Sequence, residues 1–488
     1  MEALVCRADF LLPGGGERIR DGYVLCEGER IVEARQWTPE TGDRLRARFG
    51  EQLQVIGGRL ARAGEEVPRL RGVLLPAFVK AHGHDHEQPL IGIAKDEPLT
   101  AWLDHAVNPF TGFMNREREA LTAELGCSPQ LVAYRMARLC DVHYGITASL
   151  VHHCNYNKYH LEDIAAANEG AGTTMICAVG SQDRFYVDEI LDTPAEAIRR
   201  LDAAWELGRG LPRTSFCPGP DQDFSNSRAL LVPLKRWARE HGSLFHIHSS
   251  EEPRTTAWFR ETIEPGLTPV EYLQEIDALD GDTIVAHQVN CGPRDVEILA
   301  RTRAQVAHNP LANTILGSGM PPVMEMLRAG VPVAISTDGS GSADNQNILA
   351  AARLAAQYQK AAHRDATLLP SDQLLEMITS VPARMLRLEQ GALRPGLLAD
   401  WIVVGLDRPN LTPTRLDNVV ENLLWAADGS EVEVVVSRGR VLKHDGAVLP
   451  LHDGTTPGQL MDAVQHLSER FATWRQTAPA LRGTGAHR

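Results

Sequence analysis

The feature that most constrains the fold is a repeated alternation of short apolar runs with helical patterns between residues 73 and 387. The runs are roughly four to eight residues long and rich in β-branched side chains, as buried strands are. Parallel strands joined by helices need crossover connections, which are right-handed in almost all proteins. About eight strand–helix units are present, so the sequence predicts an α/β protein with a (β/α)8 TIM-type barrel. The runs are residues 73–79, 147–151, 173–179, 214–218, 243–248, 283–287, 305–308 and 331–337.

The two ends of the chain have a different texture from the middle. Residues 1–72 hold short apolar runs separated by Gly-containing turns, and similar runs return at 401–404 and 432–436. Neither end is large enough to bury much core alone, so we expect the two to pair into one small β-sandwich. The predicted divisions are 1–72 for the N-terminal part of the sandwich, 73–387 for the barrel, 388–450 for the C-terminal part of the sandwich and 451–488 for a helical tail.

Two histidines one residue apart, His82 and His84, follow the first run. In a strand, residues i and i+2 point to the same face, so these imidazoles are expected to project together where a buried strand ends. A pair of imidazoles suits a borderline-soft divalent ion such as Zn²⁺. The alternative is an ordinary acidic, His-rich loop, because Asp85, His86 and Glu87 come next.

Other runs also end in residues that can bind a metal. The run 243–248 ends in His246 and His248, with Glu251 three residues further, and 283–287 ends in His287. Asp338 follows the run 331–337. Because the C-terminal ends of barrel strands converge on one mouth, these side chains are expected to meet. Each alone is more often a structural rim or turn residue, and only their joint occurrence in this order favours a metal site.

Six segments together carry a resemblance to a known family. They resemble the amidohydrolase superfamily, in the branch that holds triazine hydrolases and guanine- and adenosine-type deaminases. Any one of these segments is weak, and the combination is specific. The segments are 78–84 (FVKAHGH), 246–251 (HIHSSE), 285–287 (VAH), 308–319 (HNPLANTILGSG), 336–339 (STDG) and 396–400 (GLLAD).

The resemblance implies a site with one divalent metal ion, with zinc expected and iron as the alternative. A bound zinc ion makes a water molecule acidic enough to attack at neutral pH. Glu251 matches the proton-shuttling acid, His287 the residue that orients substrate and water, and Asp338 the group that accepts the proton of the water. The absence of a lysine at the end of the run 214–218 argues against a binuclear site. The implied metal ligands are His82, His84, His248 and Asp338.

The implied activity is hydrolysis of a carbon–nitrogen bond other than a peptide bond. We expect hydrolytic deamination of a purine, pterin, pyrimidine or triazine-like ring with release of ammonia. A triazine-type chlorohydrolase and a cyclic amide hydrolase remain alternatives. A non-enzymatic metal-binding scaffold is disfavoured, because binding alone needs no proton shuttle. Trp102, in a segment that resembles the family's LxxWL, His152 and His287 are the expected substrate contacts, and His86 is interpreted as a loop or supporting residue.

The composition excludes some classes of binding partner and indicates a cellular compartment. The formal net charge of −14 argues against a nucleic-acid surface or an anionic-membrane partner and says little about a small substrate; a small heterocyclic ligand is what the resemblance implies. The eight cysteines are scattered without a CxxC pair, as is typical of reduced thiols, and the N-terminus lacks a signal-peptide pattern. We therefore expect a cytoplasmic enzyme that forms a homo-oligomer.

Overall fold

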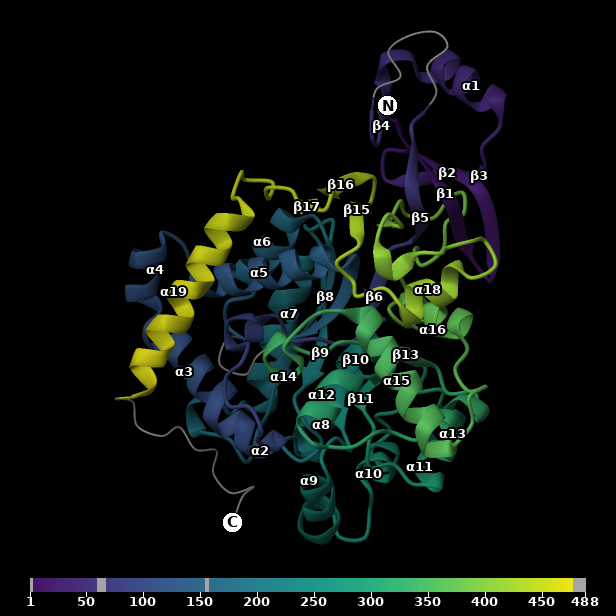
Figure 1. Cartoon of the computed structure of the whole chain (residues 1–488). Helices are drawn as coiled ribbons and strands as arrows, with labels where there is room; N and C mark the ends of the chain where they lie inside the picture. The colour runs from purple at the N-terminus through teal and green to yellow at the C-terminus, as the bar shows by residue number, and fades with distance from the viewer. Residues whose placement is uncertain (1–2, 59–66, 154–157, 477–488) are drawn as a thin grey trace.

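The computed structural model describes residues 3–58, 67–153 and 158–476, and two parallel sheets lie at its centre (Figure 1). Neighbouring strands in each sheet are consecutive in the chain and run parallel, which confirms the predicted α/β class. One sheet contains β6 (Phe78–Lys80), β7 (Ile146–His152), β8 (Thr174–Ser181) and β9 (Thr214–Pro220). The other contains β10 (Phe245–Ser249), β11 (Thr283–His287), β12 (Gln305–His308) and β13 (Val333–Ile335).

The two sheets approach each other where β9 leads towards β10. An isolated parallel bridge joins Gln222 to His248 there. Among the described strands no continuous ladder joins the two sheets, so a closed ring of eight strands stays a prediction.

Helices connect the central strands and begin at recognisable caps. Thr193 and Glu196 form a capping box at the start of α7, and Thr268 and Glu271 do the same for α10. On α8 the apolar side chains at 230, 231 and 234 are buried, so this helix turns one face to the core. The helices of this region are α5 (Pro129–His143), α6 (Leu161–Ala171), α7 (Pro194–Gly208), α8 (Arg228–Glu240), α9 (Pro253–Trp258), α10 (Pro269–Glu275), α11 (Pro293–Thr302), α12 (Pro310–Ile315), α13 (Val323–Arg328), α14 (Ser340–Ala343), α15 (Ile348–His363), α16 (Ser371–Met377) and α17 (Ser380–Met385).

The two ends of the chain meet in one nine-stranded sheet. Its central contact is between β14, from the C-terminal end, and β5, from the N-terminal end, which pair antiparallel. The predicted pairing of the ends is therefore present, and the two-layer sandwich form stays a prediction. The strands are β1 (Ala3–Gly14), β2 (Glu17–Glu27), β3 (Arg30–Gln36), β4 (Leu53–Val55), β5 (Arg69–Pro76), β14 (Trp401–Gly405), β15 (Val432–Ser437), β16 (Arg440–His444) and β17 (Ala447–Val448), with α1 (Pro39–Phe49) and α18 (Val419–Trp425) beside them.

The run predicted as one strand over residues 73–79 is two strands. Residues up to Pro76 belong to β5 in the end sheet, whereas β6 starts at Phe78. The change of partner is visible in the backbone: the Ala77 N–H donates to the Asp400 carbonyl, and the Phe78 N–H donates to the Gly145 carbonyl. Both environments bury the side chains, so hydrophobicity alone cannot locate the switch.

A long excursion follows β6 and covers one side of the central sheets. It comprises the 3-10 helix η2 (Asp85–Leu90), α2 (Leu99–Trp102), the π-helix η3 (Leu103–Val107), α3 (Asn108–Arg116) and α4 (Arg118–Leu125). The C-terminal helix α19 (Pro457–Arg475), yellow in Figure 1, lies along α3 and α5. The Phe471 ring packs 5.1 Å from Phe110 and 5.6 Å from Phe113, so the tail supports the excursion of its own chain. Residues 477–488 of the predicted tail lie outside the described residues.

The structure also bears on membrane-spanning helices and on the state of the cysteines. Within the described part of the chain, no helix combines the length and apolar character that crossing a membrane requires. The cysteines of that part are free thiols, and Cys154 lies outside it.

Candidate active site

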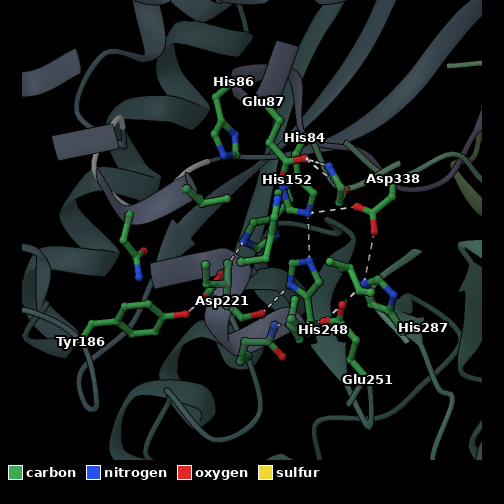
Figure 2. Close-up of a pocket in the computed structure, with 18 residues that line it drawn as sticks. His84, His86, Glu87, His152, Tyr186, Asp221, His248, Glu251, His287 and Asp338 are labelled. Carbon is green, nitrogen blue, oxygen red and sulfur yellow. Dashed lines mark hydrogen bonds and ion pairs between the residues drawn. The ribbon is translucent and has the colours of Figure 1, made fainter. Parts of the chain in front are cut away.

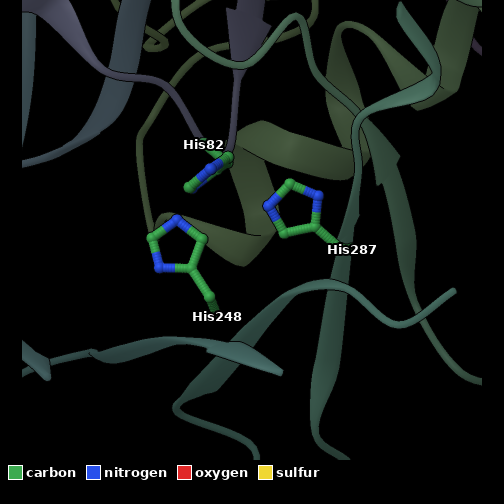
Figure 3. A group of neighbouring side chains, drawn as sticks. All are labelled: His82, His248 and His287. Carbon is green, nitrogen blue, oxygen red and sulfur yellow. The ribbon is translucent and has the colours of Figure 1, made fainter. Parts of the chain in front are cut away.

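Four side chains from the ends of β6, β10 and β13 bring their donor atoms together, and Figure 2 shows three of them, His84, His248 and Asp338. The Nε2 atoms of His84 and His248 are 3.1 Å apart. Asp338 Oδ1 lies 3.2 Å from His82 Nε2 and 3.4 Å from His84 Nε2. Figure 3 shows the rings of His82, His248 and His287 turned towards a common centre. The structure thus brings together all four residues that the sequence pointed to as ligands.

The donor atoms fit a zinc-type ion. Zn–N bonds of about 2.0–2.1 Å at tetrahedral angles place two ligand atoms about 3.3 Å apart, close to the observed separations. His82 Nε2 is buried and makes no hydrogen bond among the described residues. Burial and the neighbouring imidazoles hold the pKa of His82 and His248 below the ordinary value, so both rings are neutral and keep a lone pair. Three neutral imidazoles and a carboxylate are a donor set that zinc prefers.

The outward nitrogens of two of these histidines are occupied. His248 Nδ1 donates to the Asp221 carbonyl oxygen at 2.7 Å. His82 Nδ1 lies 3.0 Å from Nε2 of His246, whose ring stacks on that of His82 with centroids 4.9 Å apart. These contacts turn the Nε2 atom of each ligand towards the shared centre. His246 therefore supports a ligand, as expected, and is not itself in the donor set.

Glu251 and His287 lie on the side of the centre where Asp338 stands (Figure 2). His287 Nε2 is 3.6 Å from Glu251 Oε2 and 3.9 Å from Asp338 Oδ2. The other ring nitrogen of His287 donates to Asn313 Oδ1 at 2.9 Å, which leaves Nε2 facing the carboxylates. Burial raises the pKa of Glu251 to about 7, with the Asp338 charge adding to the effect against the attraction of His287. A carboxyl group with such a pKa can both hold and release a proton at neutral pH.

Two of the site residues adopt an unusual backbone conformation. His287 has φ of 73° and Asp338 has φ of 68°, in the left-handed region that non-glycine residues rarely enter. Each such residue costs of order 1–3 kcal/mol and persists only where the surrounding structure holds it. Here the backbone directs both side chains into the centre, with His287 as the last residue of β11 and Asp338 three residues after the end of β13.

A cavity opens onto these groups, and His84, His248, Glu251, His287 and Asp338 all line it. Its apolar wall comes from the excursion after β6, and Trp102 of α2 is buried there with its indole N–H unpartnered among the described residues. His152, at the end of β7, also lines the cavity. The three residues expected to touch substrate, Trp102, His152 and His287, thus border one space.

The stretch Asp85-His86-Glu87 is structured, unlike the loop that the sequence suggested. Asp85 is buried and forms an ion pair with Arg138 at 2.6 Å. Glu87 accepts hydrogen bonds from the N–H and hydroxyl of Ser342, beyond Asp338, so it holds the loop that carries that carboxylate. His86 is buried and lines the cavity, and neither ring nitrogen has a hydrogen-bond partner among the described residues. His86 therefore faces the ligand space and is not an exposed loop residue.

Sequence reasoning missed three polar residues that line the cavity, Tyr186, Asp221 and Gln222; Figure 2 labels the first two. Tyr186 donates its hydroxyl proton to Asp221 Oδ2 at 2.7 Å, and Gln222 donates to Glu251 Oε2 at 3.2 Å. Asp221 directly follows β9, so its place at a strand end was a usable signal. Tyr186 stands between two elements in an irregular segment, and no pattern marks it.

Comparisons with known proteins identify the family of the chain, its sequence relatives and a solved structure that shares its fold. The sequence profile of the amidohydrolase family matches residues 73–442. A 5-methylthioadenosine/S-adenosylhomocysteine deaminase of Thermococcus kodakarensis is 32% identical over 370 residues, or 76% of this chain and 82% of the relative. A 5′-deoxyadenosine deaminase of Methanothermobacter thermautotrophicus is 28% identical over 452 residues, or 93% of this chain and 96% of the relative. The zinc-bound crystal structure of an adenosine deaminase from Xanthomonas campestris has a TM-score of 0.80 at 22% identity, covering 96% of this chain and 98% of its own, which shows a shared fold.

Proposed function

The chain belongs to the amidohydrolase family and is a hydrolytic deaminase of a nitrogen heterocycle, and from that premise we propose that it deaminates 6-aminopurine nucleosides modified at the 5′ position. The named activities of the two sequence relatives support this choice of substrate. The reaction adds water across C6, breaks the C6–N bond and releases ammonia, leaving a 6-oxopurine nucleoside.

One observation carries the proposal. Glu251, a buried carboxyl whose pKa is raised to about 7 chiefly by burial, faces the same cavity as a zinc-type donor set. Proton transfer to a ring nitrogen needs an acid that is protonated at neutral pH, and ordinary carboxyls are not. A binding site without catalysis has no use for such a group.

We infer that one divalent ion, zinc in preference to iron, is held by His82, His84, His248 and Asp338. When bound, it supplies a Lewis acid that makes a water molecule acidic. Zinc in the Xanthomonas campestris structure supports the choice of ion.

The proton steps are assigned to three side chains. Asp338 directs Oδ1 towards the histidines and Oδ2 towards His287, so Oδ2 is free to accept the proton of the attacking water. Glu251 donates its proton to N1 of the purine as the water oxygen bonds to C6. Glu251 then takes the proton of the new C6 hydroxyl and passes it to the amine, which leaves as ammonia when the C6–N bond breaks, and the proton held by Asp338 restores the acid form of Glu251. His287, between Glu251 and Asp338, orients the attacking water, because Nε2 is left to accept a hydrogen bond when Nδ1 donates to Asn313.

The cavity walls are assigned to substrate binding. We propose that the purine lies against Trp102, whose buried N–H requires an acceptor, and against His287. His152 lines the same cavity, with Nδ1 3.3 Å from His246 Nδ1 and with Nε2 facing Asp221 but making no hydrogen bond among the described residues.

We also propose a closed barrel, a cytoplasmic location and a homo-oligomeric state. The two parallel sheets are taken as halves of one (β/α)8 barrel, supported by their consecutive strand order and by the bridge from Gln222 to His248. A cytoplasmic location is supported by the free thiols among the described cysteines. A homo-oligomer is proposed as the working form, and gel filtration with light scattering tests it.

The substrate proposal is tested with zinc-loaded protein and a panel of 5′-deoxyadenosine, 5′-methylthioadenosine, S-adenosylhomocysteine, adenosine, guanine and a chlorotriazine. Ammonia and the 6-oxopurine product are measured together. We expect turnover of the 5′-modified nucleosides at the highest kcat/KM. Activity confined to guanine or to the triazine would refute the substrate class while leaving the metal site intact.

A further inference from the structure

A chain of buried side chains runs from the proposed metal centre to a carboxylate on the far wall of the cavity. His82 Nδ1 lies 3.0 Å from His246 Nε2, and His246 Nδ1 lies 3.3 Å from His152 Nδ1. His152 Nε2 faces Asp221 Oδ1 at 3.5 Å, which is too far for a hydrogen bond, so this last link is an electrostatic contact. Tyr186 donates to the other oxygen of Asp221 at 2.7 Å. Four elements of the fold supply this chain: β6, β10, β7 and the end of β9.

The protons of this chain can be assigned without conflict. His82 turns Nε2 to the donor centre, so its single ring proton is on Nδ1 and is donated to His246 Nε2. The proton of His246 is then on Nδ1 and is donated to His152 Nδ1. The proton of His152 is then on Nε2, facing a carboxylate that can only accept. Starting from Asp221 and working backwards gives the same three tautomers.

Asp221 contacts a second ligand by a different route. Its main-chain carbonyl accepts the Nδ1 proton of His248 at 2.7 Å. One residue at the end of β9 therefore reaches two of the three histidine donors, one through its backbone and one through its side chain. A side-chain substitution at Asp221 keeps the backbone contact to His248 but also removes a carboxylate charge that acts on that ring, so a variant at His246 is needed to test the second route alone.

We propose that Asp221 is a positioning residue that fixes the tautomer and ring orientation of His82 through His152 and His246. This inference rests on the proposed metal site and deepens it. A carboxylate that accepts from a ligand histidine raises the basicity of that ligand, and loss of such a partner typically costs 10–100-fold in metal affinity. Two intervening rings transmit the effect here, so we expect a loss of about tenfold.

The test measures zinc affinity by competition with a chromophoric chelator, using the full chain stripped of metal and reloaded. Asp221→Ala is expected to weaken zinc binding by about tenfold, and Asp221→Asn, which keeps a neutral acceptor, by less. Tyr186→Phe is the matched control, because it removes the other partner of the same carboxylate and leaves the histidine chain intact. Its zinc affinity is expected to stay within about twofold of wild type.

A second variant guards against a folding defect in Asp221→Ala. His246→Phe keeps a ring stacked on His82 and removes both nitrogens, so it is expected to weaken zinc binding at least as much. Histidine ¹⁵N spectra of the metal-free protein report the tautomers directly, and an Nδ1–H signal from His82 that shifts in Asp221→Ala supports the proposal.

The outcomes separate this inference from the proposed function. Equal weakening in Tyr186→Phe and Asp221→Ala overturns the inference, because it indicates a general disturbance of the cavity. Unchanged affinity in Asp221→Ala and His246→Phe also overturns it and leaves the metal site standing. If wild type itself binds no zinc, the proposed site fails and the inference fails with it.

Discussion

Replacing Glu251 with glutamine isolates the proton shuttle from the rest of the site. The substitution is nearly isosteric and removes only the ability to gain and lose a proton. The Oε1 of a glutamine can still accept the hydrogen bond that Gln222 now donates to Glu251 at 3.2 Å. Glu251 is not one of the converging donor atoms, so the substitution is not expected to release the metal.

The size of the effect follows from the role assigned to the carboxyl. General acid–base catalysis contributes about 10²–10⁴-fold, so kcat of Glu251→Gln is expected to fall by that factor. This corresponds to about 3–5 kcal/mol of transition-state stabilisation at about 1.4 kcal/mol per tenfold. Because burial raises the pKa of Glu251 to about 7, wild-type activity should fall as pH rises through 7 and the acid form is lost. The variant should lack that limb of the profile.

The raised pKa of Glu251 also makes the free energy of unfolding depend on pH. A carboxyl whose pKa rises from its ordinary value of 4.5 to about 7 on folding binds a proton more tightly in the folded state. The folded protein therefore loses stability as pH rises from 4.5 to 7, by up to about 3 kcal/mol above that window. Metal-free Glu251→Gln is expected to be more stable than wild type at pH 8 and to lose this advantage near pH 4.5.

Three measurements check this reasoning: ammonia release for kcat, elemental analysis for bound zinc, and denaturant unfolding at the two pH values. His248→Ala is the control, because it removes a donor and should lose the metal. Loss of zinc from Glu251→Gln to the same degree as from His248→Ala would refute the division of roles. A fall in kcat of less than about tenfold would refute the shuttle itself.

Three further predictions concern the frame around the site. Arg138→Met leaves the buried Asp85 carboxylate without its ion-pair partner, while Asp141 keeps Lys80 at 2.8 Å, so unfolding in urea should show a loss of about 3–5 kcal/mol. Gly339→Ala places a Cβ 1.9 Å from the Glu87 carboxylate and should weaken zinc binding, whereas Gly458→Ala, with open space at its Cβ, should leave it unchanged. Phe471→Ala removes the aromatic contact between α19 and the excursion, so it should cost about 3–5 kcal/mol by thermal or urea unfolding and raise KM through the cavity wall.

Much of the fold and the donor set could be read along the chain. The alternation of strands and helices predicts an α/β protein with parallel sheets. It can be read from the sequence because side chains on one face recur every two residues in a strand and about every 3.6 residues in a helix, and both spacings are local. The donors His82, His84, His248 and Asp338 each stand at or just beyond the end of an apolar run. Parallel strands end at one edge, so residues far apart in sequence were expected to meet, and in the structure they do.

Other features depended on which partner a segment finds. The run through Ala77 is uniformly apolar, and only the tertiary structure decides that Pro76 pairs in the end sheet and Phe78 with β7. His86 and Glu87 looked like a polar loop, yet both are buried, because Ser342 satisfies Glu87 and the cavity receives His86.

The series of buried side chains that links Asp221 to His82 depends partly on local sequence and partly on tertiary packing. The sequence by itself determined that histidines stand at the ends of β7 and β10 and beyond β6, since each follows a recognisable apolar run. Which nitrogen faces which neighbour was decided only by the packing of four elements, which brings His152, His246 and His82 within 3.3 Å of one another in turn. Strand ends are a local property of the chain, whereas hydrogen-bond partners are set by distances that exist only after the sheets assemble.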